Sequence, residues 1–169
     1  MAIELVPLCT LHVQLKPPIE VGAGCAGTRV IVEVASAEVK GDRLRAELAG
    51  AAVADWILIG PDGTATLDIR ATLRTDDGAI IFMQYNGKAA SDCSQGLQLP
   101  ATIYVTPRFE TGDERYAWLN RIQAVGKGTV HEVFRSITSG TRFANAAGLL
   151  TLLYLSRAAG EFIGRVRCR

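Results

Sequence analysis

The segment from 55 to 85 most constrains the fold, because runs of alternating apolar and polar residues are separated there only by short turn signals. The runs cover 55–59, 64–74 and 79–85, and the signals between them are Pro61-Asp62-Gly63 and Asp76-Asp77-Gly78. Alternation places apolar side chains on one face of an extended chain, and turn sequences of this kind join neighbouring antiparallel strands. This segment is therefore predicted to be a three-stranded antiparallel meander.

Further strands are predicted on the same grounds along residues 1–136. They cover 5–15, 28–39, 43–48, 101–106, 116–125 and 129–134, with Gly126-Lys127-Gly128 as a turn before the last of them. Helix-length periodic segments do not separate these strands, which argues against a βαβ arrangement. About nine short strands predict an all-β domain at 1–136, an antiparallel closed or nearly closed β-barrel or a closely related sandwich.

The segment 137–169 differs in character from the rest of the chain. Its part from Ala144 to Leu155 is rich in Ala and Leu and carries no charge before Arg157. We predict a helical C-terminal extension, whose uninterrupted apolar stretch is shorter than the roughly 20 residues that a membrane span needs. Packing on the barrel or on a second subunit is the favoured role, and contact with a membrane surface is the alternative. A homodimer or higher homo-oligomer is expected.

Charge and composition exclude several function classes. The 18 basic and 17 acidic residues give a net charge of +1, so no broad positive field is available for nucleic acid. The first residues lack the pattern of a secretory signal, so a cytoplasmic protein without stable membrane insertion is expected. Only two histidines occur, and Cys9, Cys25, Cys93 and Cys168 are scattered singly. This spacing predicts no metal site, and no cofactor is expected.

Polar residues at every second position of 64–74 provide a candidate site. Thr66, Asp68, Arg70 and Thr72 share one face, opposite an apolar face that begins at Ala65. In a sandwich the polar face would be wet, whereas in a small closed barrel it would line a lumen that holds one ligand. The sequence leaves both arrangements open.

Two-residue turns in the meander would gather four ionisable residues. A turn at Pro61-Asp62 places Asp55 opposite Asp68, and a turn at Asp77-Gly78 places Arg70 opposite Tyr85. Paired carboxylates raise one pKa, and an arginine and a phenol stabilise a developing oxyanion, so this patch predicts catalysis of proton transfer. The alternative is an Asp–Arg ion pair that only sets the strand register on a solvated face.

Other side chains are predicted to bind a substrate. His12 lies on the polar side of its strand, and Trp56 and Trp118 are large enough to form walls against a flat ligand. The alternatives are a plain surface histidine and two tryptophans of the core. The predicted substrate-binding residues are His12, Trp56, Arg108, Tyr116, Trp118 and Asn120.

Short motifs in a fixed order carry a family resemblance over roughly residues 4–135. They are the paired prolines at 17–18, Gly41-Asp42-Arg43-Leu44-Arg45, Ala54-Asp55-Trp56, Pro61-Asp62-Gly63, Leu67-Asp68, Leu73-Arg74-Thr75-Asp76-Asp77-Gly78-Ala79, Thr106-Pro107-Arg108-Phe109-Glu110-Thr111-Gly112 and Tyr116-Ala117-Trp118-Leu119-Asn120. On these motifs the chain resembles the domain-of-unknown-function family numbered 3237. The resemblance implies a compact antiparallel β-barrel, and it implies no reaction common to all members.

The two functional interpretations share the same lumen. The first is a cofactor-independent enzyme that performs proton-transfer chemistry, as an isomerase, cyclase, dehydratase or hydrolase, on a hydrophobic metabolite. Asp55 or Asp68 would be its acid or base, with Arg70 and Tyr85 as oxyanion partners. The second is a non-catalytic protein that binds or carries a small hydrophobic molecule. A third interpretation, assembly driven by the C-terminal extension, predicts that its removal changes the oligomeric state.

Overall fold

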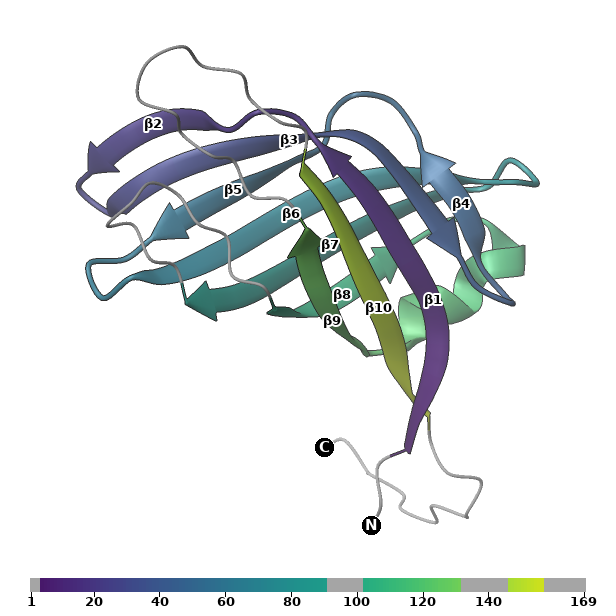
Figure 1. The fold of residues 1–169 in the computed structure, drawn as a ribbon. Helices are drawn as coiled ribbons and strands as arrows, with labels where there is room; N and C mark the ends of the chain where they lie inside the picture. Colours follow the sequence, from purple (N-terminus) through teal and green to yellow (C-terminus); the bar gives the residue numbers. More distant parts are fainter. Residues whose placement is uncertain (1–3, 91–101, 132–145, 157–169) are drawn as a thin grey trace, which may run out of the picture.

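The computed structural model describes residues 4–90, 102–131 and 146–156, which form ten strands and one short 3-10 helix (Figure 1). The strands are β1 (Glu4–Leu15), β2 (Ile19–Gly24), β3 (Gly27–Lys40), β4 (Arg45–Leu48), β5 (Ala54–Ile59), β6 (Thr64–Thr75), β7 (Ile80–Ala90), β8 (Ile103–Glu110), β9 (Ala124–His131) and β10 (Ala146–Ser156). The helix is η1 (Glu114–Arg121).

The pairings run around the molecule as a barrel. The sheet order is β1-β10-β9-β8-β7-β6-β4-β3-β2, and β5 pairs with both β3 and β6. A further pairing joins β1, at one end of this order, to β3, the strand next to the other end, and every pairing is antiparallel. Figure 1 shows the strands curving around a common interior. The predicted antiparallel, barrel-like fold is therefore confirmed.

Alternation along β6 decides which side of the wall is apolar. Ala65, Leu67, Ile69, Ala71 and Leu73 are all buried, while the residues between them are half-buried or exposed. The hydrophobic effect favours this orientation, because each apolar side chain leaves water when it faces the interior. The polar stripe of β6 thus faces outward, which decides between the two arrangements that the sequence left open.

Both hairpins of the meander have three-residue loops instead of the predicted two-residue loops. The Gly60 N–H donates to the Thr64 carbonyl at 2.9 Å, and the Thr75 N–H donates to the Ala79 carbonyl at 2.9 Å. The third loop residue in each case is a glycine with positive φ, 76° at Gly63 and 89° at Gly78. A type I turn followed by a left-handed residue is the usual three-residue hairpin loop. Each strand register is consequently shifted by one residue from the prediction.

Most of the predicted strand at 116–125 is absent, because residues 116–121 lie in η1 and only 124–125 are in a strand, at the start of β9. The Asp113 side chain caps η1 by accepting the Arg115 N–H at 3.0 Å, and Leu119 of η1 is fully buried. The expected turn at 126–128 instead lies inside β9, where Gly126 pairs with Val105 of β8 and with Leu152 of β10. Within the described ranges, no helix is long and apolar enough to cross a membrane.

Two strands were missed by the sequence interpretation. The predicted helix over 144–155 is wrong for Ala146–Ser156, because β10 pairs with β1 on one edge and β9 on the other. A continuous apolar sequence can belong to a strand as well as to a buried helix, and periodicity does not separate the two. β2 escaped prediction because nearly all of its residues are exposed, so it lacks an apolar face. Residues 137–145 and 157–169 of the predicted extension lie outside the described residues.

Candidate functional site

The observed register separates the four predicted catalytic residues into two pairs on opposite sides of the barrel wall. Asp55 pairs with Ile69 rather than Asp68, and Ile69 in turn pairs with Tyr85. Asp55 and Tyr85 are therefore buried with Ile69 on the inner face. Asp68 and Arg70 lie on the outer face, with side chains 32% and 55% exposed, and form an ion pair at 3.2 Å. The predicted arrangement of all four as one patch is wrong.

The inner pair borders a cavity of about 70 Å³ in the barrel interior. Aliphatic side chains from β1, β3, β5, β6, β8 and β9 form most of its wall, and Asp55, Tyr85 and Thr129 supply the polar groups. Among the described residues that line it, Asp55 is the only carboxylate. An acid in such surroundings has lost much of its hydration, which changes its ionisation.

Burial governs the chemistry of Asp55. The residue is 8% exposed, and its Oδ1 accepts the backbone N–H of Asp68 at 3.0 Å. Desolvation raises the pKa of Asp55 to about 7; the Asp68 N–H opposes this shift and the nearby Asp68 charge adds to it. The carboxyl group is thus poised to gain and lose a proton near neutral pH.

Tyr85 supplies a neutral donor beside this acid. Burial first, and the charge of Asp55 second, raise the pKa of the Tyr85 hydroxyl above its ordinary range. The phenol therefore stays protonated throughout the physiological range. A protonated phenol in an apolar site can donate a hydrogen bond to an oxygen that becomes negative during a reaction.

Three predicted substrate-binding residues lie away from the cavity, on the outer face. His12 of β1 and Arg108 of β8 are exposed. Trp56 of β5 is half-buried, and the Arg70 guanidinium lies 5.9 Å from its ring centroid. These residues do not share one surface with Asp55 and Tyr85.

The other three predicted binding residues belong to η1. Figure 1 shows η1 at the barrel end where the β3–β4 and β6–β7 loops also lie. The Tyr116 hydroxyl donates to Asp77 Oδ1 at 3.1 Å, and Asn120 exchanges two 2.9 Å hydrogen bonds with the Thr111 backbone. The Arg43 guanidinium lies 3.9 Å from the Trp118 ring centroid. These contacts attach η1 to the barrel, and a role in substrate binding stays a prediction.

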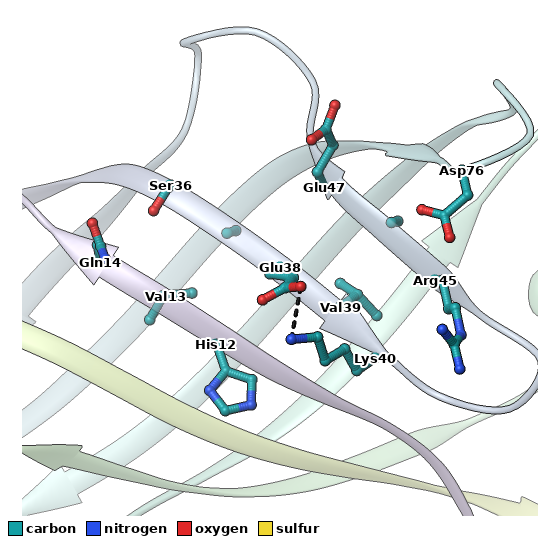
Figure 2. Close-up of a pocket in the computed structure, with 12 residues that line it drawn as sticks. His12, Val13, Gln14, Ser36, Glu38, Val39, Lys40, Arg45, Glu47 and Asp76 are labelled. Carbon is teal, nitrogen blue, oxygen red and sulfur yellow. Dashed lines mark ion pairs between the residues drawn. The ribbon is translucent and has the colours of Figure 1, made fainter.

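The outer face carries a larger groove of about 550 Å³ across β1, β3 and β4 (Figure 2). Its polar side chains include His12, Glu38, Lys40, Arg45 and Glu47, all of them exposed. Lys40 and Glu38 already pair at 2.8 Å. Because these groups remain hydrated and their charges compensate one another, the inner cavity is the better candidate for chemistry.

One signal in the sequence marks Asp55 as an inner residue. Asp55 has the same strand parity as Ile57 and Ile59, so it shares the apolar face of β5, whereas Asp68 shares the polar face of β6. The sequence interpretation missed Thr129, the third polar group of the cavity. Within the described part of the chain, no three His, Cys, Asp or Glu side chains form a group suited to a metal ion.

Comparison with solved structures supports the fold. A β-barrel-like protein of Acinetobacter baumannii superposes with a TM-score of 0.70 at 26% identity, over 92% of this chain and 98% of that one. A protein of Penicillium herquei, described as an enzyme, has a TM-score of 0.62 at 18% identity, over 92% of this chain and 96% of that one. The first likeness agrees with the observed barrel, and the second shows the fold alone.

Comparison of sequences gives the family. An uncharacterised UPF0311 protein of Rhodopseudomonas palustris is 30% identical over 114 residues, which cover 62% of this chain and 74% of the relative. The model of the family described as protein of unknown function (DUF3237) matches residues 3–138. This match spans most of the chain and confirms the resemblance carried by the sequence motifs. The chain belongs to the DUF3237 family.

Proposed function

We propose that the barrel interior is the site of a cofactor-independent enzyme that catalyses proton transfer on a small hydrophobic metabolite. The observation that carries this proposal is Asp55, a buried carboxyl group with a pKa of about 7 on the wall of an apolar cavity. A general acid or base is most effective when its pKa lies near the working pH. Asp55 meets this condition through its burial in the barrel wall.

The two polar groups suit an isomerisation through an enolate. The Asp55 carboxylate removes a proton from the carbon next to a carbonyl group, and the Tyr85 hydroxyl donates a hydrogen bond to the resulting enolate oxygen. Protonated Asp55 then returns the proton to another atom of the substrate, so that no co-reactant is consumed. The same pair of an acid–base and an oxyanion donor would also serve a cyclisation, dehydration or hydrolysis that passes through a negatively charged oxygen.

The size of the cavity limits what enters it. Its volume of about 70 Å³ is well below the roughly 300–1,000 Å³ of pockets that hold a drug-sized ligand. We infer that the substrate either is very small or inserts only its reacting end among the aliphatic side chains. Uncharged ketones and lactones satisfy both the size and the polarity of the walls.

A protein with the same fold supports a catalytic role for this type of barrel. The Penicillium herquei protein is described as an enzyme. Its fold accommodates catalysis, although fold by itself does not transfer a reaction from one protein to another.

Hydrogen exchange tests the proposed chemistry directly. The protein would be incubated in heavy water with a panel of small hydrophobic ketones and lactones, and deuterium uptake by each compound would be followed by mass spectrometry. Loss of a general acid–base is expected to reduce exchange by about 100- to 10,000-fold in Asp55→Asn. The matched control is Glu110→Gln, which alters an exposed carboxylate of β8 and is expected to leave exchange unchanged. Equal exchange by the wild type and Asp55→Asn would overturn the assignment.

The second candidate function is binding or transport without catalysis. It is favoured by the apolar character of most of the cavity wall and by the hydrogen bond that already occupies Asp55 Oδ1. Native mass spectrometry of gently purified protein would detect a retained small molecule and report the predicted homo-oligomer. A carrier would hold that molecule unchanged, and Asp55→Asn would then bind it as tightly as the wild type.

A further inference from the structure

Beside Asp55, one backbone hydrogen bond of the ladder between β5 and β6 is replaced by hydrogen bonds to side chains. Gly60 and Thr64 form a hydrogen-bonded pair, and in an antiparallel ladder every second pair along the strands is bonded in the same way. Leu58 pairs with Thr66, so the next bonded pair in this register is Trp56 with Asp68. The regular ladder would therefore join the Asp68 N–H to the Trp56 carbonyl.

Both groups have side-chain partners instead. The Asp68 N–H donates to Asp55 Oδ1 at 3.0 Å, and the Trp56 carbonyl accepts from Arg29 Nη1 at 2.8 Å. Both hydrogen bonds are partly buried. One backbone bond has thus been exchanged for two bonds to side chains, one on the Asp55 carboxylate and one on the Arg29 guanidinium.

Arg29 approaches Trp56 from the other edge of β5. It is a half-buried residue of β3 and pairs with Leu58 in the β3–β5 register. A partly buried carbonyl without a partner is costly, so the Trp56 carbonyl needs a donor. Without the guanidinium, the nearest donor in the register is the Asp68 N–H itself.

We propose that Arg29 is a positioning residue for Asp55, because its hold on the Trp56 carbonyl leaves the Asp68 N–H free to bind the Asp55 carboxylate. A hydrogen bond from an N–H group favours the ionised form of a carboxyl group. Arg29 thereby acts on the inner acid from the outer side of the barrel wall, through two peptide groups and without touching the cavity. Its importance for catalysis rests on the proposed function of Asp55.

A pH titration followed by NMR tests this proposal. The measured signals are the carboxyl carbon of Asp55 and the amide proton of Asp68, in wild-type protein, in Arg29→Leu and in the control Arg74→Leu, which alters an exposed arginine of β6. In the wild type and the control, the two signals are expected to change with one common midpoint. In Arg29→Leu, the signal of the Asp68 amide is expected no longer to change at the midpoint of Asp55. The midpoint of Asp55 itself is expected to rise by about one pH unit or more, because its carboxylate loses one hydrogen bond.

The outcomes separate the two proposals. An Asp68 amide that still follows Asp55 in Arg29→Leu, with the midpoint unchanged, would overturn the role of Arg29. A wild-type Asp55 that titrates in the ordinary range of an aspartate would instead remove the basis of the proposed function, while the Asp68 amide would still report on Arg29. If Arg29→Leu does not fold, Arg29→Gln keeps a shorter donor and is expected to show a smaller rise. An unchanged midpoint there would also refute the proposal.

Discussion

Asp55 and Asp77 lie in the same meander, yet their surroundings change their pKa values in opposite directions. Asp55 is 8% exposed and has one N–H partner, and burial raises its pKa to about 7. The side chain of Asp77 is 47% exposed and accepts hydrogen bonds from Thr75, Tyr116 and Arg115. The Thr75 hydroxyl is the main cause of its lowered pKa. Desolvation dominates at the first aspartate, and hydrogen bonding dominates at the second.

The interior of the barrel also differs between the end that carries η1 and the region around Asp55. At the η1 end, Leu119 is fully buried in a continuous core with Leu73, Ile81 and Phe109. Around Asp55, the interior instead contains a cavity and an acid that is costly to ionise. Full burial of Leu119 contributes stability at the η1 end, whereas the cavity region keeps an acid whose ionised form is unfavourable there, as functional sites commonly do.

The largest expected effect is at the η1 end. Leu119→Ala removes a fully buried side chain and is expected to lower the free energy of unfolding by about 2–5 kcal/mol. The matched control is Leu58→Ala on the outer face, where the side chain is only half-buried and a smaller loss is expected. Chemical denaturation of both variants would measure the difference. Equal losses would contradict the expectation that full burial gives Leu119 the larger contribution.

The next effect concerns the ionisation of Asp55. Because the pKa of Asp55 is higher in the folded than in the unfolded state, protonation of Asp55 stabilises the folded protein. This stabilisation is complete below the unfolded pKa and is lost as the pH rises through about 7. The wild-type free energy of unfolding is therefore expected to fall between about pH 4 and pH 7, by on the order of 3–4 kcal/mol. Asp55→Asn removes the ionisation and should flatten this part of the profile. A decline of the same size in the variant would show that another group causes it.

The smallest effect concerns Asp77, whose contribution to the free energy of unfolding changes with pH in the opposite direction to that of Asp55. Its lowered pKa stabilises the folded protein above the unfolded pKa, and this stabilisation is lost as the pH falls through the folded pKa. Asp77→Asn should therefore make the acid side of the stability profile, below about pH 4, less steep. Thermal unfolding of the variant and the wild type across this range would test the expectation. A change confined to neutral pH would contradict it.

Much of the fold was predictable from the periodicity of the sequence. The alternation in 64–74 correctly identified which residues of β6 share a face, and the Pro-Asp-Gly and Asp-Asp-Gly signals correctly located both hairpins. β10 and η1 were not predictable in this way. The Ala- and Leu-rich sequence of β10 fits a strand as well as it fits a helix, because a continuous apolar run lacks the periodicity that separates the two. The conformation of η1 depends on its Asp113 cap and on the burial of Leu119.

The candidate site depended on a one-residue difference in register. The sequence by itself determined that Asp55 shares a face with Ile57 and Ile59, and that Asp68 shares a face with Arg70. Only the tertiary structure decided that the first face is inside the barrel and that three-residue loops align Asp55 and Tyr85 on either side of Ile69. A period of two residues defines the faces of a strand, but a shift of one residue exchanges its neighbours across the sheet. The raised pKa of Asp55 likewise arises from the assembled barrel, because removal of water requires side chains from many strands at once.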